Sequence, residues 1–437
     1  MSFFTAICVA FVIGYAFIAL ESVTKINKAA VAILMCVVCW TLLALGHGEL
    51  SMPGFELGEA IERNLGEAGT TLFFLMGAMT IVEIVDQHGG FNWVRGVLKS
   101  RTKRSLLWKI AFMTAILSAV LDNLTTSIVM IMILRKLVHD KSDRIWYAVC
   151  VIIAANAGGA FSPIGDVTTI MLWNGKMITA LGVIKEIIVP SFVAFIVPTA
   201  VLQMHLKGEL PQVVSKREES ISEVTKFERN MIFALGVGGL CCVPVFHTLT
   251  ELPAFVGILG VLGILWCVTE IIYRKNEEHD PMAKRVTRML SRIDMATIMF
   301  FLGILMAVAT LSEIGVLTAI GQWLDETVGN NYLVTGAIGI LSSIVDNVPL
   351  VAGAMKMYVI DPASASFAVD GIFWQLLAYC AGVGGSMLII GSAAGVVVMG
   401  LENISFGWYM RNVTWIAFVG YIAGMLCYWL EKTVLAM

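Results

Sequence analysis

An apolar segment, residues 105–139, carries the pair Asp122-Asn123 at its centre. A single transmembrane crossing has only one cytoplasmic end, so dense positive charge at both ends of a segment argues against a single crossing. Such charge is present at both ends here, at Arg101, Lys103, Arg104, Arg135, Lys136, Lys141 and Arg144. We therefore predict a re-entrant hairpin that enters from the cytoplasm, turns at Asp122-Asn123 and returns. Each arm, of about 12–16 residues, reaches the middle of a ~30 Å hydrocarbon layer.

The same pattern occurs again in residues 331–358, which carry Asp346-Asn347 at their centre. Pro349 fits the first turn of a second half-helix, where its missing N–H costs nothing. Polar backbone at this depth is tolerated only where it is buried in protein or lines a cavity. The two hairpins are therefore predicted to carry carboxylates to mid-membrane, where such groups are costly and usually functional.

Composition places the chain among polytopic membrane proteins. Of its 437 residues, 58% are hydrophobic and 14% are charged, and its mean hydropathy is +0.85. These values exclude a soluble globular domain. Residues 1–20 lack a basic n-region and a small-residue cleavage site, so we predict a first span rather than a signal peptide. Without a basic patch interleaved with aromatic residues, we expect no nucleic-acid partner.

Apolar runs of crossing length recur along the whole chain. The uninterrupted crossings are predicted at residues 1–20, 28–46, 68–86, 186–206, 230–247, 254–272, 294–312 and 412–430. Two more, residues 145–175 and 371–401, are interrupted by glycines and polar residues, which is typical of helices unwound at mid-depth. A charged linker, residues 207–229, separates residues 1–206 from residues 230–437. We predict an all-α membrane protein with two inverted-topology repeats, each with five crossings, a re-entrant hairpin and a broken helix.

Internal similarity and charge support this plan. Gly158-Gly159 and Gly165 match Gly384-Gly385 and Gly391 at a constant offset of 226. Positive charge marks cytoplasmic segments, and 24 of the 29 Lys and Arg residues fall in 21–28, 92–109, 135–144, 207–229, 272–292 and 401–411. Because each repeat crosses an odd number of times, the second repeat is inverted and its hairpin enters from outside.

The hairpin tips and broken helices supply oxygen donors. Carboxylate, amide, hydroxyl and freed carbonyl oxygens suit a hard cation. These motifs contain no Lys or Arg that would neutralise an anionic substrate, which favours a cation as cargo. The candidate ligands are Asp122, Asn123, Thr126, Asn156, Ser162, Asp166, Thr168, Asp346, Asn347, Ser386 and Ser392.

Structural roles remain open for several of these residues. Asp122 and Asp346 could cap the second half-helix of each hairpin. Asp166 could partner a neighbouring hydroxyl, and the hydroxyls of Thr168, Ser386 and Ser392 could hold membrane helices together. A serine or asparagine cap would avoid a mid-membrane carboxylate, which favours a ligand role for the aspartates.

Four segments, SAVLDNLTTSIVM, NAGGAFSPIGDVTTIMLW, SSIVDNVPL and GVGGSMLIIGSAAGV, resemble those of NhaD-type sodium/proton antiporters within the ion transporter superfamily. The resemblance covers nearly the whole chain and implies exchange of internal Na⁺ or Li⁺ for external H⁺. It also implies a homodimer whose hairpin-bearing transport units move against a scaffold. The site residues that it implies are Asp122, Asn123, Asn156, Asp166, Thr168, Asp346, Asn347 and Ser386.

The expected mechanism requires a carboxylate that binds either H⁺ or Na⁺, never both. Full burial can raise the pKa of an aspartate from ~3.9 by as much as ~3–5 units, into the working pH range. We expect a multi-pass protein of a bacterial inner membrane with lipid and the transported ions as partners. We also expect no enzymatic activity and no resident cofactor.

A channel is possible, but inverted hairpins favour alternating access. Two further alternatives remain. One is a superfamily relative that carries arsenite or an organic anion. The other is an intramembrane aspartyl protease, because Gly165-Asp166 matches part of a Gly-x-Gly-Asp motif. Pro163 occupies the place of the first glycine, and no Tyr-Asp or Pro-Ala-Leu partner motif is present. These departures argue against the protease.

Overall fold

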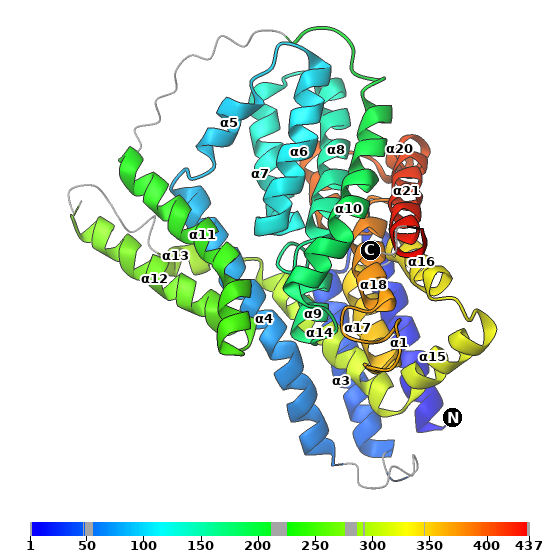
Figure 1. Cartoon of the computed structure of the whole chain (residues 1–437). Helices are drawn as coiled ribbons and strands as arrows, with labels where there is room; N and C mark the ends of the chain where they lie inside the picture. The colour runs from blue at the N-terminus through cyan, green and yellow to red at the C-terminus, as the bar shows by residue number, and fades with distance from the viewer. Residues whose placement is uncertain are drawn as a thin grey trace.

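The computed structural model describes residues 2–46, 48, 56–210, 225–275, 286–291, 293–344 and 346–434. Within these ranges the chain folds into helices joined by short connections (Figure 1). Eight of the described helices are long and apolar enough to cross a membrane. The predicted class, an all-α polytopic membrane protein, is thus confirmed. Parts of the predicted loops 207–229 and 272–292 lie outside the described residues.

The first half follows the predicted order of segments. It begins with α1 (Phe3–Ala19), α2 (Glu21–Thr24), α3 (Lys28–Gly46), α4 (Leu57–Gln87) and α5 (Asn92–Leu98). The first hairpin is formed by α6 (Lys103–Leu121) and α7 (Asn123–Leu137), which meet at Asp122. The broken crossing is α8 (Lys141–Ala160) with α9 (Val167–Asn174), and α10 (Ala180–Leu202) completes this half. The third predicted crossing begins earlier than expected, at Leu57 rather than at residue 68.

The second half repeats this order. It begins with α11 (Lys226–Thr250), α12 (Ala254–Lys275), α13 (Val286–Leu290), α14 (Met295–Glu313) and α15 (Val316–Thr327). The second hairpin consists of α16 (Asn331–Ser342) and α17 (Asn347–Met357). The broken crossing and the last span are α18 (Ile372–Gly384), α19 (Ala393–Glu402), α20 (Phe406–Asn412) and α21 (Thr414–Thr433). The sequence reading omitted α15, which takes the place in this half that α5 takes in the first.

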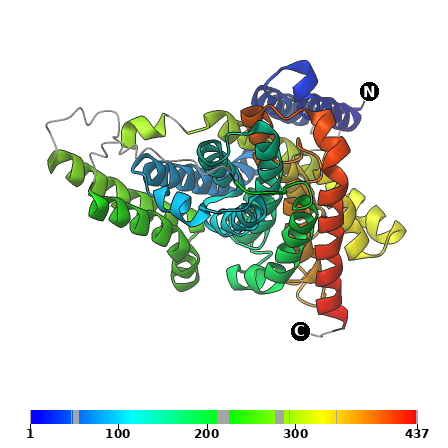
Figure 2. The same cartoon turned by 90° about the horizontal axis from the view of Figure 1, so that it is seen from above.

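In space the helices form two groups, and each group draws on both halves of the chain. In the first group, here called the panel, α3 packs on α1 and α14, while α4 packs on α11, α12 and α14. In the second, here called the bundle, α6 packs on α8, α7 on α19, α10 on α21 and α16 on α18. Figure 1 shows α6, α7, α8 and α10 side by side in its upper half, with α11 and α12 paired at its left edge. Seen from above, the green α11 and α12 lie on the opposite side of the molecule from the red α21 (Figure 2).

The panel and the bundle meet along the second hairpin and the first broken helix. Helix α17 packs against α14 and α15, and α9 packs against α4. The two hairpins and the two broken helices all belong to the bundle. The division into repeats at residues 207–229 stays a prediction about the sequence, and the packing cuts across it.

Equivalent glycines allow equivalent close approaches in the two halves. A Cβ on Gly158 would lie 2.3 Å from the carbonyl oxygen of Ala115 on α6. A Cβ on the matching residue, Gly384, would lie 2.2 Å from the carbonyl oxygen of Gly339 on α16. In each half the broken helix therefore touches the backbone of the first hairpin arm, which only glycine permits. These contacts explain why the glycines recur at a constant offset.

Several segments that were assigned to the cytoplasm lie together at one end of the bundle. Lys103, at the start of α6, pairs with Asp143 of α8 at 2.5 Å. Glu402, at the end of α19, is fully buried and pairs with Arg135 and Arg144 at 2.8 and 2.7 Å. Both ends of the first hairpin therefore lie on the same face as the loop that follows α19. The charge pattern alone determined the side of that loop only weakly.

A labelling experiment tests this topology. Cysteines placed at Arg104 and at Lys141, both exposed, are expected to react with a membrane-impermeant maleimide from the cytoplasmic side only. The background lacks Cys241, Cys242 and Cys267, which are exposed. A cysteine at Asp361 serves as the control and is expected to label from the other side. Labelling of positions 104 and 141 from opposite sides would show that residues 105–139 cross the membrane and do not form a hairpin.

Candidate functional site

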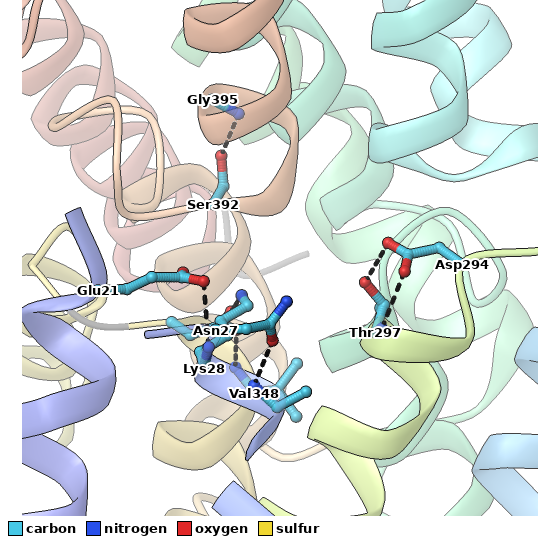
Figure 3. Close-up of polar contacts among 10 residues, drawn as sticks. Glu21, Asn27, Lys28, Asp294, Thr297, Val348, Ser392 and Gly395 are labelled. Carbon is cyan, nitrogen blue, oxygen red and sulfur yellow. Dashed lines mark hydrogen bonds and ion pairs between the residues drawn. The ribbon is translucent and has the colours of Figure 1, made fainter. Parts of the chain in front are cut away.

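Four short helices of the bundle begin at a polar residue whose side chain caps them. Asp122 caps α7, Asp166 caps α9, Asp346 caps α17 and Ser392 caps α19. The close-up in Figure 3 shows the last of these, in which the hydroxyl of Ser392 accepts the N–H of Gly395 at 3.1 Å. Because a helix N-terminus carries partial positive charge, these starts favour ionised carboxylates. The structural and the ligand readings of the aspartates are therefore compatible.

A buried network of amides and hydroxyls connects the first hairpin tip to both broken helices. The amide nitrogen of Asn123 donates to Oδ1 of Asn156 at 3.1 Å and to Oδ2 of Asp166 at 2.7 Å. The amide nitrogen of Asn156 donates in turn to the hydroxyls of Ser386 and Ser392, both at 2.9 Å. All five side chains are at most 6% exposed. The structure thus joins five predicted residues from both halves of the chain.

Asp166 is the carboxylate of this network. Its Oδ1 accepts hydrogen bonds from the N–H and the hydroxyl of Thr168 at 2.9 and 2.8 Å, and Asn123 donates to Oδ2. The side chain is 1% exposed, and no ion pair among the described residues includes it. Neutral hydrogen-bond donors and the N-terminus of α9 therefore stabilise its negative charge. Such a carboxylate can accept one further positive charge, either a proton or a metal cation.

Asp122 occupies a strained position at the tip of the first hairpin. Its φ of 85° and ψ of 158° lie in a region that is populated almost solely by glycine. Both of its carboxylate oxygens bond to Thr125, one to the N–H at 2.8 Å and the other to the hydroxyl at 2.7 Å. Asp122 and Asp166 are also close enough to interact electrostatically. A residue kept in such a conformation, where glycine would relax, indicates that its side chain is needed.

This position permits a sharp test of cap against ligand. Asp122→Gly relieves backbone strain of ~1–3 kcal/mol. Replacing a capping residue by glycine costs only about a few tenths of a kcal/mol of helix stability. We expect an unchanged or higher melting temperature together with loss of ion transport. Asp122→Asn, which keeps the cap, is expected to fold equally well and also to lose transport. Normal transport by either variant would reduce Asp122 to a helix cap.

Asp346, at the tip of the second hairpin, contacts a cation that the sequence reading missed. Its Oδ2 lies 2.7 Å from the ammonium nitrogen of Lys28, at the start of α3, and its Oδ1 accepts the N–H of Val348 at 3.3 Å. Figure 3 shows Lys28 above Val348, with Glu21 and Asn27 beside it. In the charge pattern of the sequence, Lys28 counts only as one of the cations of residues 21–28. No sequence signal ties it to a residue more than 300 positions away.

The remaining predicted residues differ in their surroundings. The hydroxyl of Thr126 is buried without a hydrogen-bond partner among the described residues. Ser162 donates to the carbonyl of Ala119 on α6, so its hydroxyl ties the broken helix to the hairpin. Asn347 is 6% exposed at the start of α17. The metal-ligand role of the whole set stays a prediction.

A cavity of about 400 Å³ opens beside Asp346, between the panel and the second hairpin. Lys28, Lys25 and Glu21 line it from the panel. Among the described residues, no group of three or more His, Cys, Asp and Glu side chains could hold a metal ion. The donors that do converge are the carboxylate of Asp166, amides and hydroxyls, and Asp346 lies close enough to Asp166 to interact electrostatically. Such a set matches a weakly held hard cation rather than a resident transition metal.

Two hairpins and two broken helices that converge on buried polar groups define a secondary transporter of the inverted-repeat class. The chain matches the CitMHS family, described as citrate transporter, over residues 15–376. It belongs to this family and to the NhaD-type sodium/proton antiporters. The expected resemblance is thereby confirmed.

Individual relatives support this assignment. The chain is 43% identical to sodium/proton antiporter 1 of Arabidopsis thaliana, over 97% of this chain and 72% of that protein. It is 31% identical to the Na⁺/H⁺ antiporter NhaD of Vibrio parahaemolyticus, over 78% and 84% of the two chains. The crystal structure of the Alcanivorax borkumensis YdaH transporter superposes with a TM-score of 0.60 and 13% identity, covering 93% of this chain and 98% of that one. At that identity the likeness supports the fold alone.

Proposed function

We propose that this protein is a secondary active transporter that exchanges cytoplasmic Na⁺ or Li⁺ for external H⁺ by alternating access. The observation that carries the proposal is the buried carboxylate of Asp166, which is surrounded by neutral oxygen and nitrogen groups and paired with no described side-chain cation. The relatives named as sodium/proton antiporters support the same cargo. A proton and Na⁺ are the two charges that such a carboxylate can exchange.

The chemistry at Asp166 follows from charge balance. In the absence of Na⁺, Asp346 is neutralised by Lys28, which leaves Asp122 and Asp166 as the aspartates that require a proton. Of these two, Asp166 bonds to the buried amide network, so we assign the exchanged proton to it. When Na⁺ binds, the proton leaves Asp166, and the carboxylates of Asp166 and Asp346 share the metal with nearby amide and hydroxyl oxygens. A bare carboxylate is costly in the membrane interior, so only the protonated and the Na⁺-bound forms cross.

Movement is proposed to occur between the two helix groups. All four half-helix starts lie in the bundle, while the panel contacts it mainly through α14 and α4. The bundle would carry the ion past the panel, in the manner of an elevator, and the panel would form the contact between two copies in a homodimer. We place the protein in a bacterial inner membrane, with lipid around it. The plant relatives show that the family is not confined to bacteria.

An organic anion is the second candidate cargo, because the family description names citrate and half-helix N-termini can bind anions. In this chain a carboxylate or hydroxyl already caps each of these starts, and Lys28 is paired. Among the described residues, the one unpaired positive charge beside a tip is that of the exposed Lys25, which lines the cavity at Asp346. The buried network around Asp166 holds none, so the cation is favoured. The protease is disfavoured because its chemistry needs two carboxylates that share a proton, whereas Asp166 bonds to Asn123 and Thr168. We therefore propose no enzymatic activity and no resident cofactor.

Transport by purified protein in liposomes tests the function. A pH-sensitive dye inside acidified vesicles is expected to report alkalinisation when Na⁺ or Li⁺ is added outside, and no response to K⁺. Citrate and arsenite are added in parallel, and radiolabelled citrate is followed directly. Citrate uptake without a Na⁺ response would refute the proposed antiport and support an organic-anion transporter instead.

A further inference from the structure

The ion pair between Lys28 and Asp346 joins the panel to the bundle. The ammonium of Lys28 lies 2.7 Å from the carboxylate of Asp346 and 4.3 Å from the ring centre of Phe300 on α14. The backbone N–H of Lys28 donates to Glu21 at 3.1 Å, which fixes the start of α3. The two side chains are only 24% and 12% exposed. The ammonium is therefore held by a carboxylate and an aromatic face.

This arrangement has no counterpart at the first hairpin. Both oxygens of Asp122 bond to Thr125 of its own hairpin. Within the described part of the chain, neither Asp122 nor Asp166 takes part in an ion pair. The two tips carry the same Asp-Asn pair, yet only the second is matched with a lysine. The asymmetry indicates a task that belongs to Asp346 alone.

The cavity beside the pair gives the lysine room to move. It holds about 400 Å³ and is lined by Lys28, Asp346, Lys25 and Glu21. A cation that enters this cavity reaches Asp346 while the carboxylate of Asp346 is still paired with Lys28. Glu21 is a second carboxylate on the same cavity and can accept a released ammonium group.

We propose that Lys28 is a tethered cation that competes with Na⁺ for Asp346. It neutralises Asp346 when no Na⁺ is bound, and it turns toward Glu21 when Na⁺ binds. The reason is electrostatic: one oxygen of Asp346 already bonds to the start of α17, and two unit charges on the other oxygen would repel each other. The proposal rests on the proposed Na⁺/H⁺ exchange and adds to it a link between ion binding and movement, because displacement of Lys28 releases the second hairpin from the panel.

A second ion pair supplies the matched control. Lys356, at the other end of α17, pairs with Glu67 of α4 at 2.6 Å and also joins the bundle to the panel. It lies outside the predicted site, and Glu67 is 55% exposed. Lys356→Gln therefore removes a link between the same two groups without freeing Asp346.

Binding of Na⁺ to the purified protein, measured by titration calorimetry, tests the competition. Lys28→Gln removes the competing charge and is expected to lower the half-saturating Na⁺ concentration about tenfold, equivalent to ~1.4 kcal/mol. Lys356→Gln is expected to bind Na⁺ as the wild type does. Lys28→Arg keeps the charge and is therefore expected to bind Na⁺ more weakly than Lys28→Gln. Unchanged or weaker Na⁺ binding by Lys28→Gln would overturn the proposal.

A measurement on the wild-type protein keeps the proposal testable if Lys28→Gln does not fold. Na⁺ is expected to increase the modification of Lys28 by a water-soluble acylating reagent several-fold, while choline at equal ionic strength does not. Lys25, exposed on the same cavity, is the internal control and should react equally in both. Equal reactivity of Lys28 with and without Na⁺ would refute displacement. A wild-type protein that neither binds nor transports Na⁺ would refute the proposed function instead.

Discussion

Replacing Asp166 by asparagine is expected to reduce Na⁺/H⁺ exchange at least ~100-fold, equivalent to ~2.7 kcal/mol, without preventing folding. Asparagine keeps an oxygen that can accept the N–H and hydroxyl of Thr168, so the cap on α9 is retained. It cannot release a proton, and it offers Na⁺ no negative charge. The new amide group would also face the amide nitrogen of Asn123. Rotation of the Asn123 amide relieves this mismatch if the Asn156 amide rotates with it, so that the hydroxyls of Ser386 and Ser392 donate to its oxygen. Initial rates in liposomes and a melting curve measure the two effects separately.

The chain offers a closely matched control for this variant. Asp370 accepts the N–H and hydroxyl of Thr179, both at 2.7 Å, and an amide N–H from Gln375 at 2.8 Å. These are the same three kinds of donor that surround Asp166, but Asp370 lies in the loop before α18, outside the network. Asp370→Asn is expected to cost similar stability and to leave exchange near the wild-type rate. If both variants lose exchange equally, the loss in Asp166→Asn reflects local structure rather than lost charge.

Much of the architecture could be predicted because each feature is local in the sequence. Apolar runs of fixed length gave the crossings, and an Asp-Asn pair between basic flanks gave the hairpin that turns at Asp122. The interruptions of the two broken crossings place Asp166 and Ser392 at the starts of α9 and α19, where the structure has them. Side-chain oxygens are favoured at helix starts, so local chemistry alone placed each of these residues at the start of a helix.

Other features depend on packing between segments that are distant in the sequence. Such packing could not be predicted from a single sequence. The panel and bundle each combine both halves of the chain, because α3 packs on α14 and α10 on α21 rather than each repeat folding alone. The amphipathic α15 is too short and too polar to be recognised as a crossing. Lys28 lies on a different helix group from the motifs, so a search confined to the motifs missed the cation that meets Asp346.

The strongest test of the exchange mechanism is how Na⁺ affinity changes with pH. If H⁺ and Na⁺ bind the same carboxylate, each bound proton excludes one Na⁺. Below the pKa of that carboxyl group, the half-saturating Na⁺ concentration is then expected to rise tenfold for each unit that the pH falls, equivalent to ~1.4 kcal/mol per unit. Above the pKa it is expected to become constant, because no proton remains to be displaced. Half-saturating Na⁺ is measured across a pH series with equal pH on both sides of the membrane.

The geometry of Asp166 makes this competition strict. Its carboxylate has one oxygen engaged by Thr168 and the other by Asn123, and its 1% exposure leaves almost no water to screen a second charge. Protonation and Na⁺ binding therefore act on the same few atoms and cannot occur together. Separate sites would instead give a constant half-saturating Na⁺ concentration, with only the maximal rate changing with pH. A constant value throughout the active pH range would exclude Asp166 as the shared site, whatever the effect of Asp166→Asn on the rate.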